Sequence, residues 1–318
     1  MKDQNANLRT ALLTGLSLIA FAANSLLTRM ALGEASIDAA SFVTIRLTSG
    51  ALMLLFISAF SQTALSQTAF KKTAFKKTAF KKPSFSQKSF STVPHSHKPK
   101  AYIAAVMLFV YAVAFSFAYR QLAAGTGALI LFGTVQLTMV LAALKQGEKP
   151  SRLEWSGLFI AMVGLVYLVS PGLAAPPIVG SMLMMISGIA WGFYSLIGRG
   201  AISPVVNTQN NFIRAVPLAL GVSLISFSQW HLSAQGIVLA VLSGALASGV
   251  GYALWYAALR GLTATRAATV QLSVPVIAAA GGTLFLNEAL SVRLAIASLM
   301  ILGGIGTAVL GRRQKSLL

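Results

Sequence analysis

The stretch RGLTATRAATVQLSVPVIAAAGGTLFLNE, residues 260–288, has a counterpart 140 positions earlier in the same chain. That counterpart is RQLAAGTGALILFGTVQLTMVLAALKQGE, residues 120–148, and the two align without a gap. Identical pairs include Arg120 with Arg260, Ala128 with Ala268 and Glu148 with Glu288. At an offset of 170, the first apolar run matches the sixth in the same way, and Arg29 meets Arg199. The chain is therefore predicted to contain two copies of one unit.

The composition is typical of a membrane protein. Of the 318 residues, 56% are hydrophobic and 10% are charged, with a mean hydropathy of +0.76, whereas soluble domains carry about 25% charged residues. A helix that crosses a bilayer needs about 20 mostly apolar residues. Ten candidate runs are present, at 10–32, 39–61, 101–119, 124–144, 155–170, 178–198, 206–228, 235–259, 267–286 and 292–310. We expect an all-α membrane protein with ten transmembrane helices, five in a first repeat (1–170) and five in a second (171–318).

Basic residues predict the orientation of these spans. If the N-terminus is cytoplasmic, 20 Lys and Arg residues fall on the inner side and 3 on the outer side, as the positive-inside rule requires. Both termini are therefore expected in the cytoplasm, with the protein in the inner (plasma) membrane. Because five is odd, the second repeat enters the membrane the other way up. Such inverted repeats are common in secondary transporters, in which two packings of the halves expose a site to either side.

The segment 62–99 separates the second and third runs and differs in character. It contains TAFKK three times, at 68–72, 73–77 and 78–82, and most of nine lysines that lie between 62 and 100. A step of five residues aligns the phenylalanines on neither a helix nor a strand, so we expect a disordered cytoplasmic loop. The alternative is that its lysines and phenylalanines rest on anionic lipid. Nucleic acid is not expected as a partner, because a loop tethered at a membrane offers no groove-reading element.

Other chemistry is sparse in the sequence. There is no cysteine and no GxxxxGK[ST] phosphate loop, and the six acidic residues and three histidines fall in tails, connections or helix ends. We therefore expect no catalytic residues, no metal site, no cofactor and no enzyme activity. The usual proton carriers are missing from the spans. This predicts exchange or facilitated diffusion, or proton coupling confined to Glu148 and Glu288.

Three stretches resemble a known family. They are LKQGEKPSRLEWSGLFIAMVGLVYL (144–168), YALWYAALRGL (252–262), and the closing unit with Pro275, LNE (286–288) and LMILGGIGTAVL (299–310). Together they look like the EamA repeat of the drug/metabolite transporter superfamily, and the resemblance covers nearly the whole chain apart from 62–99. It implies ten helices, two inverted repeats and movement of small metabolites, often outward. One departure is Val135, which stands where the second unit has Pro275, so only the ninth helix is expected to kink.

Polar and aromatic side chains deep in a span are the first candidates for contact with a substrate. The resemblance implies a central cavity, and we expect it to be lined by Asn24, Tyr111, Gln136, Trp191, Tyr194, Tyr252, Trp255 and Gln271. For the aromatic residues the alternative is helix packing or a position at the membrane interface. For the two glutamines it is a hydrogen bond between helices.

Two glutamates follow apolar runs and suggest gates. Glu148, on the inner side, and Glu288, on the outer side, are expected either to hold helix junctions together or to latch one face at a time. Arg46 and Arg214, within the second and seventh spans, are candidate partners. The leading hypothesis is thus a secondary transporter for a small amino acid-like or drug-like metabolite, working by alternating access. The alternatives are a pore-like facilitator, a non-transporting scaffold and an intramembrane enzyme.

Overall fold

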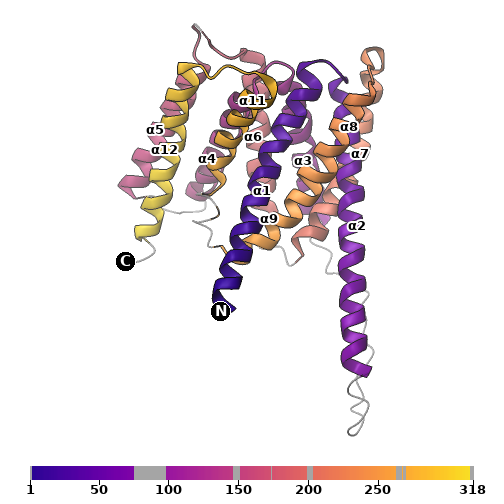
Figure 1. The fold of residues 1–318 in the computed structure, drawn as a ribbon. Coiled ribbons are helices and arrows are strands. Elements are labelled where there is room, and N and C mark those ends of the chain that lie inside the picture. The colour runs from indigo at the N-terminus through magenta and orange to yellow at the C-terminus, as the bar shows by residue number, and fades with distance from the viewer. Residues whose placement is uncertain are drawn as a thin grey trace.

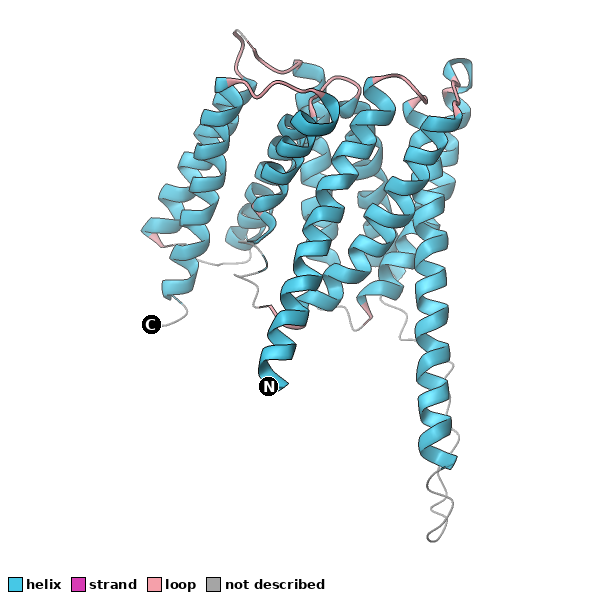
Figure 2. Ribbon diagram, in the orientation of Figure 1, coloured by secondary structure: helices cyan, strands magenta, loops and turns pink. Residues whose placement is uncertain are grey.

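The structure is a computed structural model that describes residues 2–74, 98–145, 151–172, 174–198, 203–262, 267 and 270–315. Within these residues all regular elements are helices and no strand occurs (Figure 2). The first half of the chain holds α1 (Lys2–Gly33), α2 (Ala39–Ala74), α3 (Lys98–Tyr119), α4 (Ala124–Lys145) and α5 (Arg152–Val169). The second half begins with α6 (Ile178–Gly198), α7 (Pro204–Ile225) and the short 3-10 turn η1 (Phe227–Gln229).

The rest of the second half contains a long composite helix and two more helices. The α-helix α8 (Ala234–Leu242), the π-helix η2 (Ser243–Val250) and the α-helix α9 (Gly251–Leu259) follow one another without a break. They are followed by α11 (Ser273–Leu286) and α12 (Val292–Lys315). A π-helix is rare and often marks a functional position in a helix. Here it lies in the middle of the composite helix, which suits a site at membrane depth.

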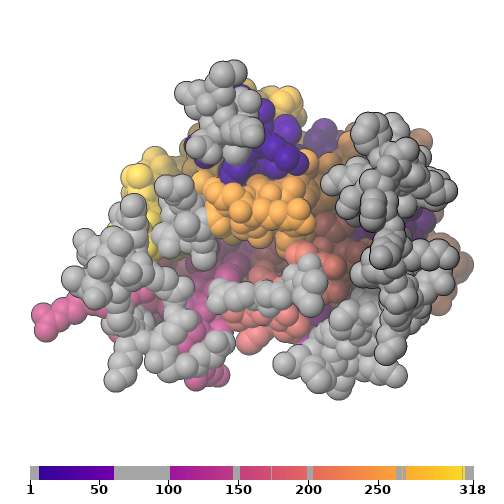
Figure 3. Space-filling model, turned by 90° about the horizontal axis from the view of Figure 1, so that it is seen from below, coloured from indigo at the N-terminus to yellow at the C-terminus, as the bar shows by residue number. Residues whose placement is uncertain are grey.

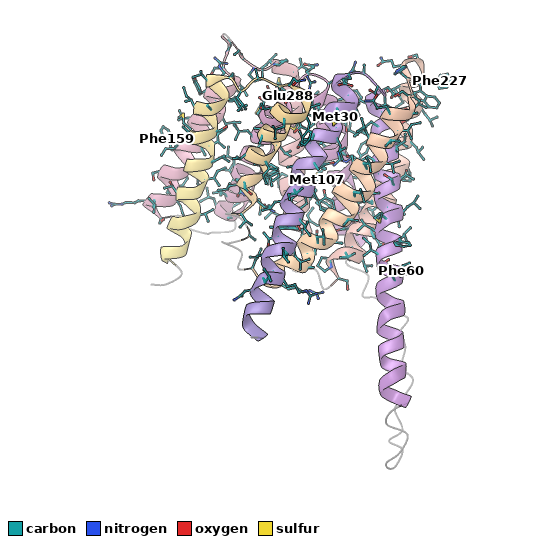
Figure 4. All side chains as sticks on the ribbon, viewed as in Figure 1. Met30, Phe60, Met107, Phe159, Phe227 and Glu288 are labelled. Atoms are coloured by element: carbon teal, nitrogen blue, oxygen red, sulfur yellow. The ribbon has the colours of Figure 1, made fainter. Side chains whose placement is uncertain are left out.

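Eight helical segments in the described residues are long and apolar enough to cross a membrane. They are α1, α2, α3, α4, α5, α6, the composite helix Ala234–Leu259 and α12. The shorter α11 is also apolar, whereas α7 starts with a polar turn. Large apolar side chains cover the outside of the bundle, and Phe60 and Phe159, labelled in Figure 4, are 63% and 64% exposed. Such an apolar exterior is suited to lipid. The chain is a multi-pass membrane protein.

The two ends of the bundle differ. α1 begins and α12 ends at the lower end in Figure 1, and α2 projects beyond the other helices at that end. At the upper end, the α1–α2 connection meets the α7–α8 connection through a bridge between Ile37 and Leu232 and a 3.1 Å hydrogen bond from Ser233 N to Ser36 O. The terms upper end and lower end are used below in this sense.

The segment 62–99 differs from the loop expected from the sequence. α2 continues to Ala74 and includes the first TAFKK copy, and α3 already begins at Lys98. No glycine or proline occurs between Gly50 and Pro83, so nothing in the sequence ends α2 where the apolar run ends. The prediction of a disordered loop is therefore wrong for residues 62–74. Residues 75–97 lie outside the described residues.

Helices from the two halves of the chain interleave. α3 packs against α6 and α7, α1 against η2, α9 and α11, and α4 against α6 and α11. α2 packs against α7 and η2, and α5 against α12, as Figure 1 shows for the last pair.

Glycines permit the closest approaches between these helices. A Cβ atom added at Gly304 would lie 2.6 Å from the backbone nitrogen of Ala161 on α5, and one added at Gly244 would strike the carbonyl oxygen of Arg46.

The ninth expected span is interrupted close to its proline. A turn at Leu272 separates Gln271 from α11, and Pro275 is buried in the first turn of α11. Proline has no N–H with which to bond the carbonyl four residues earlier, which here belongs to Gln271. α4, with Val135 at the corresponding position, runs unbroken from Ala124 to Lys145. The two related helices therefore differ at the same depth.

Candidate functional site

A cavity of about 360 Å³ lies in the middle of the bundle. Its size is within the range of small-molecule pockets. The lining comes from α1, α3, α4, α6, η2 and α9, and from Pro204, Ala267 and Gln271. It extends from mid-helix residues such as Asn24 and Tyr111 to Gly198 and Leu259, which end their helices at the lower end. In the view from below, α9 (orange) faces the neighbouring ends of α6 and α7 (salmon) across the middle of the molecule (Figure 3).

All eight residues expected at the cavity from the sequence line it. These are Asn24, Tyr111, Gln136, Trp191, Tyr194, Tyr252, Trp255 and Gln271. The structure thus brings them together, while contact with a substrate stays a prediction. The alternative roles, helix packing and hydrogen bonds between helices, are also supported for some of these residues. Asn24 and Tyr194 each make hydrogen bonds to other helices, and all five aromatic residues pack against one another or their neighbours.

Aromatic rings form one wall of the cavity. Trp191 lies at its centre, with ring centroids 5.3 Å from Tyr252 in a stacked arrangement, 4.7 Å from Tyr111 and 5.3 Å from Tyr194. Phe21 on α1 extends this wall, 5.8 Å from both Tyr252 and Trp255. Offset and tilted ring pairs at these distances are mutually attractive. The wall therefore offers rigid, largely apolar contact area from four helices.

Polar groups gather at the inner end of the cavity, farthest from the lower end. Asn24 Nδ2 donates to the Tyr111 hydroxyl (3.3 Å), and Ser243 Oγ in the π-helix donates to Asn24 Oδ1 (2.7 Å). Arg46 Nη2 donates to the same Tyr111 hydroxyl (3.0 Å). The hydroxyl of Ser248, also in the π-helix, lines the cavity and has no hydrogen-bond partner. This cluster joins α1, α2, α3 and η2 at one point.

A second chain of hydroxyl groups lies nearer the lower end. Tyr194 Oη donates to Thr208 Oγ1 (3.4 Å), and Thr208 Oγ1 donates to Tyr256 Oη (3.3 Å). These contacts tie α6, α7 and α9 together beside the cavity. The first turns of α7 are polar, which is why α7 is less apolar than the other spans. They contribute Thr208 to the hydroxyl groups beside the cavity.

Glu288 links several helix ends at the upper end of the bundle. Its Oε1 pairs with Arg29 Nε at 3.1 Å, and its Oε2 accepts from the backbone nitrogen of Ala124, the first residue of α4, at 2.8 Å. Arg29 Nη1 also donates to the carbonyl oxygen of Tyr119 at the end of α3 (3.1 Å). We call this set the upper latch, defined by Arg29, Tyr119, Ala124 and Glu288. It joins α1, α3, α4 and α11, and Figure 4 shows Glu288 at the upper end.

The backbone conformation at the end of α11 places Glu288 beside Arg29 and Ala124. Asn287 adopts a left-handed conformation (φ 52°) that ends α11, a position that asparagine tolerates better than most residues. The chain then turns back, and Glu288 N donates to Gly282 O at 3.1 Å. The carboxylate meets the N-terminus of α4, where the helix dipole and the free N–H favour a negative charge. In the LNE motif, asparagine thus ends α11, and the glutamate that follows it binds α1 and α4.

The remaining gate predictions have mixed outcomes. The partner of Glu288 is Arg29, so the suggestion that Arg46 or Arg214 would pair with it is wrong. Arg46 lies beside the cavity, and Arg214 is placed over the ring of Tyr102, 5.4 Å from its centroid. Both oxygens of the Glu288 carboxylate are instead occupied by Arg29 and by the N-terminus of α4. Glu148 lies outside the described residues.

Several cavity and latch residues were not singled out from the sequence. Phe21, Phe115 and Ser248 line the cavity, and Arg29 completes the latch. Arg29 carried a usable signal, because it is one of the basic residues that the 170-residue offset repeats. The phenylalanines carried none, since phenylalanine is equally common on lipid-facing positions. No group of three or more metal-ligating side chains occurs among the described residues.

Comparison with known proteins supports the same class. The profile of the EamA-like transporter family matches residues 178–310. An uncharacterized protein of Pseudomonas aeruginosa is 46% identical over 297 residues, which is 93% of each chain. A protein of Salmonella typhimurium named as a probable amino-acid metabolite efflux pump is 24% identical over 211 residues, 60% of this chain and 69% of that one.

A solved structure shares the fold. A crystal structure whose name gives no function superposes with a TM-score of 0.58 at 18% identity, over 93% of this chain and 98% of that chain. A multi-pass helical bundle with a central cavity, related in sequence to named transporters, is a membrane transporter. More narrowly, the chain belongs to the EamA-like transporter family, as the resemblance of its repeats predicted.

Proposed function

We propose that the protein is a secondary carrier that moves a small metabolite outward across the inner membrane by alternating access. The observation that carries this proposal is the asymmetry of the cavity. Its inner end is separated from the upper end by the latch around Glu288, while its lining continues to the lower helix ends. A site reached from one side at a time is the requirement of a carrier. The name of the Salmonella relative makes an amino acid-like metabolite the first substrate class to test.

Helix packing supports ten spans in two inverted repeats, 1–170 and 171–318. If each helix of the first half corresponds to one in the second, α1 to α6, α3 to the composite helix and α4 to α11, the contacts repeat. α3 packs on α6 as α9 packs on α1, and α4 packs on α6 as α11 packs on α1. α5 pairs with α12, its own counterpart. This is the pattern of a two-fold axis in the membrane plane.

The repeat also supports a second latch. Glu148 is the counterpart of Glu288, and Arg199 is the counterpart of Arg29. Both counterparts lie outside the described residues. We infer that Arg199 and Glu148 close the lower side when the upper latch opens, so that one pair forms in each state. With both termini in the cytoplasm, the upper end is the outer face.

Two further points complete the proposal. Transport is by exchange or facilitated diffusion, or by proton coupling through the latch glutamates, because the one other acidic group in the described spans, Glu154, is held in the capping box that starts α5. The lysines around 62–99 are proposed to contact anionic lipid at the inner leaflet, each contributing about 1 kcal/mol near the surface. The proposed role invokes no nucleic acid, cofactor or metal.

Counterflow in proteoliposomes tests the carrier. Vesicles loaded with an unlabelled amino acid-like substrate should take up the same labelled compound to a transient peak above its outside concentration. Only a site that alternates between the two sides gives that peak. Simple equilibration without an overshoot would instead favour the pore-like facilitator. An imposed pH gradient that drives several-fold accumulation in the Glu148→Gln, Glu288→Gln double variant would contradict the proposed coupling.

Trp191→Ala is expected to raise the concentration for half-maximal transport by roughly tenfold, because the ring stacks at the centre of the aromatic wall. Trp155→Ala is the matched control, since that ring is 53% exposed on α5 and does not line the cavity. The measurement is the concentration dependence of counterflow at equal protein levels. Equal effects of the two substitutions would show that the aromatic wall does not contact the substrate.

A further inference from the structure

Arg46 is a charged side chain buried in the middle of the bundle. It lies on α2 seven residues from the upper start of that helix, and only 2% of its surface is exposed. Its Nη2 bonds the Tyr111 hydroxyl, but its Nε and Nη1 have no hydrogen-bond partner. The faces of Tyr111 and Phe115 lie 5.3 Å and 4.9 Å from the guanidinium carbon. Two ring contacts and one neutral hydrogen bond are weak compensation for a buried guanidinium.

No carboxylate neutralises this charge in the part of the chain that the structure describes. Glu288 pairs with Arg29 at the upper end. Asp38 accepts from the backbone of Ser41 and His231, and Glu154 closes a capping box with Ser151 at the start of α5. An unpaired charge at membrane depth is costly and marks a functional position by default. A ligand in the cavity would supply the missing negative charge.

Tyr111 connects Arg46 to the cavity. Its hydroxyl oxygen accepts from both Arg46 Nη2 and Asn24 Nδ2, which occupies the two lone pairs of that oxygen. The hydroxyl proton is left to donate to a group in the cavity that Tyr111 lines. Ser248 adds a second hydroxyl without a partner at the same inner end. The inner end thus presents donors backed by a positive charge, which is the arrangement that binds an anion.

The inverted repeat indicates that this charge serves more than packing. Arg46 and Arg214 occupy corresponding places in α2 and α7, yet Arg214 is only partly buried and lies over Tyr102, whose side chain is 62% exposed. Arg214 can therefore direct its charge toward the membrane edge, as long basic side chains do. Arg46 is held inward instead. The fold thus retains the costly arrangement on only one of two related helices.

We propose that the cavity binds a small monocarboxylate, with the carboxylate at the Arg46–Tyr111 pair and the apolar part of the molecule against the aromatic wall around Trp191. This inference rests on the proposed function and narrows its substrate to an anion. One unpaired cation matches one carboxylate.

Purified full-length protein tests the assignment with probes matched except for charge. Binding of phenylacetate and phenylacetamide is followed by the intrinsic fluorescence of the four tryptophans, of which Trp191 and Trp255 line the cavity. The acid should bind at least tenfold more tightly than the amide. Arg46→Met should weaken the acid by roughly 10- to 100-fold, the range for hydrogen bonds to a charged group, and leave the amide unchanged. Arg214→Met, the repeat counterpart, should keep the preference for the acid.

Two measurements separate a binding role from a structural one. Without ligand, Arg46→Met should unfold at the same temperature as the wild type or higher, because it removes an uncompensated charge. Tyr111→Phe deletes only the hydroxyl and should reduce the preference for the acid about tenfold, which decides the matter if Arg46→Met does not fold. Equal binding of acid and amide, or an acid preference that survives in Tyr111→Phe or in a folded Arg46→Met, overturns the proposal.

The outcomes also distinguish this inference from the function on which it rests. Counterflow with a cationic or neutral substrate, and none with acids, would support the carrier function and contradict the proposal that the cavity binds a monocarboxylate. Binding of phenylacetate that depends on Arg46, without counterflow of that acid or of related monocarboxylates, supports the anion site and counts against the carrier.

Discussion

Glu288→Gln is expected to expose the cavity to the upper side. The carboxylate accepts from a guanidinium and from a helix N-terminus, at 3.1 and 2.8 Å. Glutamine has the same shape but only one acceptor oxygen and no charge, so its NH₂ group must face either Arg29 or the N–H of Ala124. Losing one charge-assisted bond costs about 1.5–3 kcal/mol. The population open at the upper end should then rise by roughly tenfold or more.

The absence of cysteine makes this rise measurable. Gln136→Cys places a single thiol on α4 in the lining of the cavity, at a half-buried position. A membrane-impermeant maleimide is then added to intact cells, which in the proposed orientation expose the upper end, or to inverted vesicles, which expose the lower end. With the upper latch intact, labelling should be faster in inverted vesicles. Adding Glu288→Gln should raise labelling in cells about tenfold.

Glu34→Gln is the matched control, because Glu34 is an exposed carboxylate at the same end of the bundle. It should leave the labelling rate unchanged. Exchanging the charges in Arg29→Glu with Glu288→Arg should not restore closure, since an arginine at 288 would face the donating N–H of Ala124. Full recovery in the exchanged variant, or no change in Glu288→Gln, would show that the upper latch is not what keeps this end closed.

The helices themselves were predictable, because lipid imposes a simple requirement on sequence. A span must be apolar for about 20 residues and satisfy its own backbone, and the ends of α4, at Ala124 and Lys145, lie within one residue of the expected run. The end of α2 was not predictable from hydropathy. Its apolar run stops near Ser61, but helix-forming residues without a breaker carry the helix on to Ala74.

The candidate site was predictable in its polar members and less so in its partners. Trp191 and Gln136 stand out in an apolar span whatever face they occupy. Phe21 and Phe115 do not, because both the interior and the lipid side of a membrane helix are apolar, so periodicity does not reveal the inward face. The sequence also could not predict that Arg46 would be buried and Arg214 partly exposed. Their positions in the repeat correspond, and only the packing around each decides whether the guanidinium reaches an edge.

Gly304→Ala is expected to destabilise the protein by breaking the close contact between α5 and α12. The new Cβ would lie 2.6 Å from the backbone nitrogen of Ala161 and 3.1 Å from its Cα. Backbone atoms cannot rotate aside, so α5 and α12 must separate along their length. Overpacking of this kind costs about 1–3 kcal/mol, and the midpoint of thermal unfolding should fall by roughly 5 °C. The measurement is thermal unfolding of the purified protein in detergent.

Gly303→Ala provides the control one residue away, because a Cβ atom there meets nothing within 4 Å. It should leave the unfolding temperature unchanged or raise it slightly, since alanine favours a helix over glycine. A comparable fall for Gly303→Ala would mean that loss of glycine, and not the clash, is responsible.

The reciprocal substitution Gly157→Ala should behave like Gly304→Ala, because its Cβ would lie 2.6 Å from the backbone nitrogen of Ala308 on α12. The double variant separates two explanations of the loss. If the helices must move apart for the first methyl group, the second methyl enters space already opened, and the combined loss should be smaller than the sum. If each methyl group instead disturbs only its own helix, the losses should add. A less than additive result would therefore locate the loss in the α5–α12 contact itself.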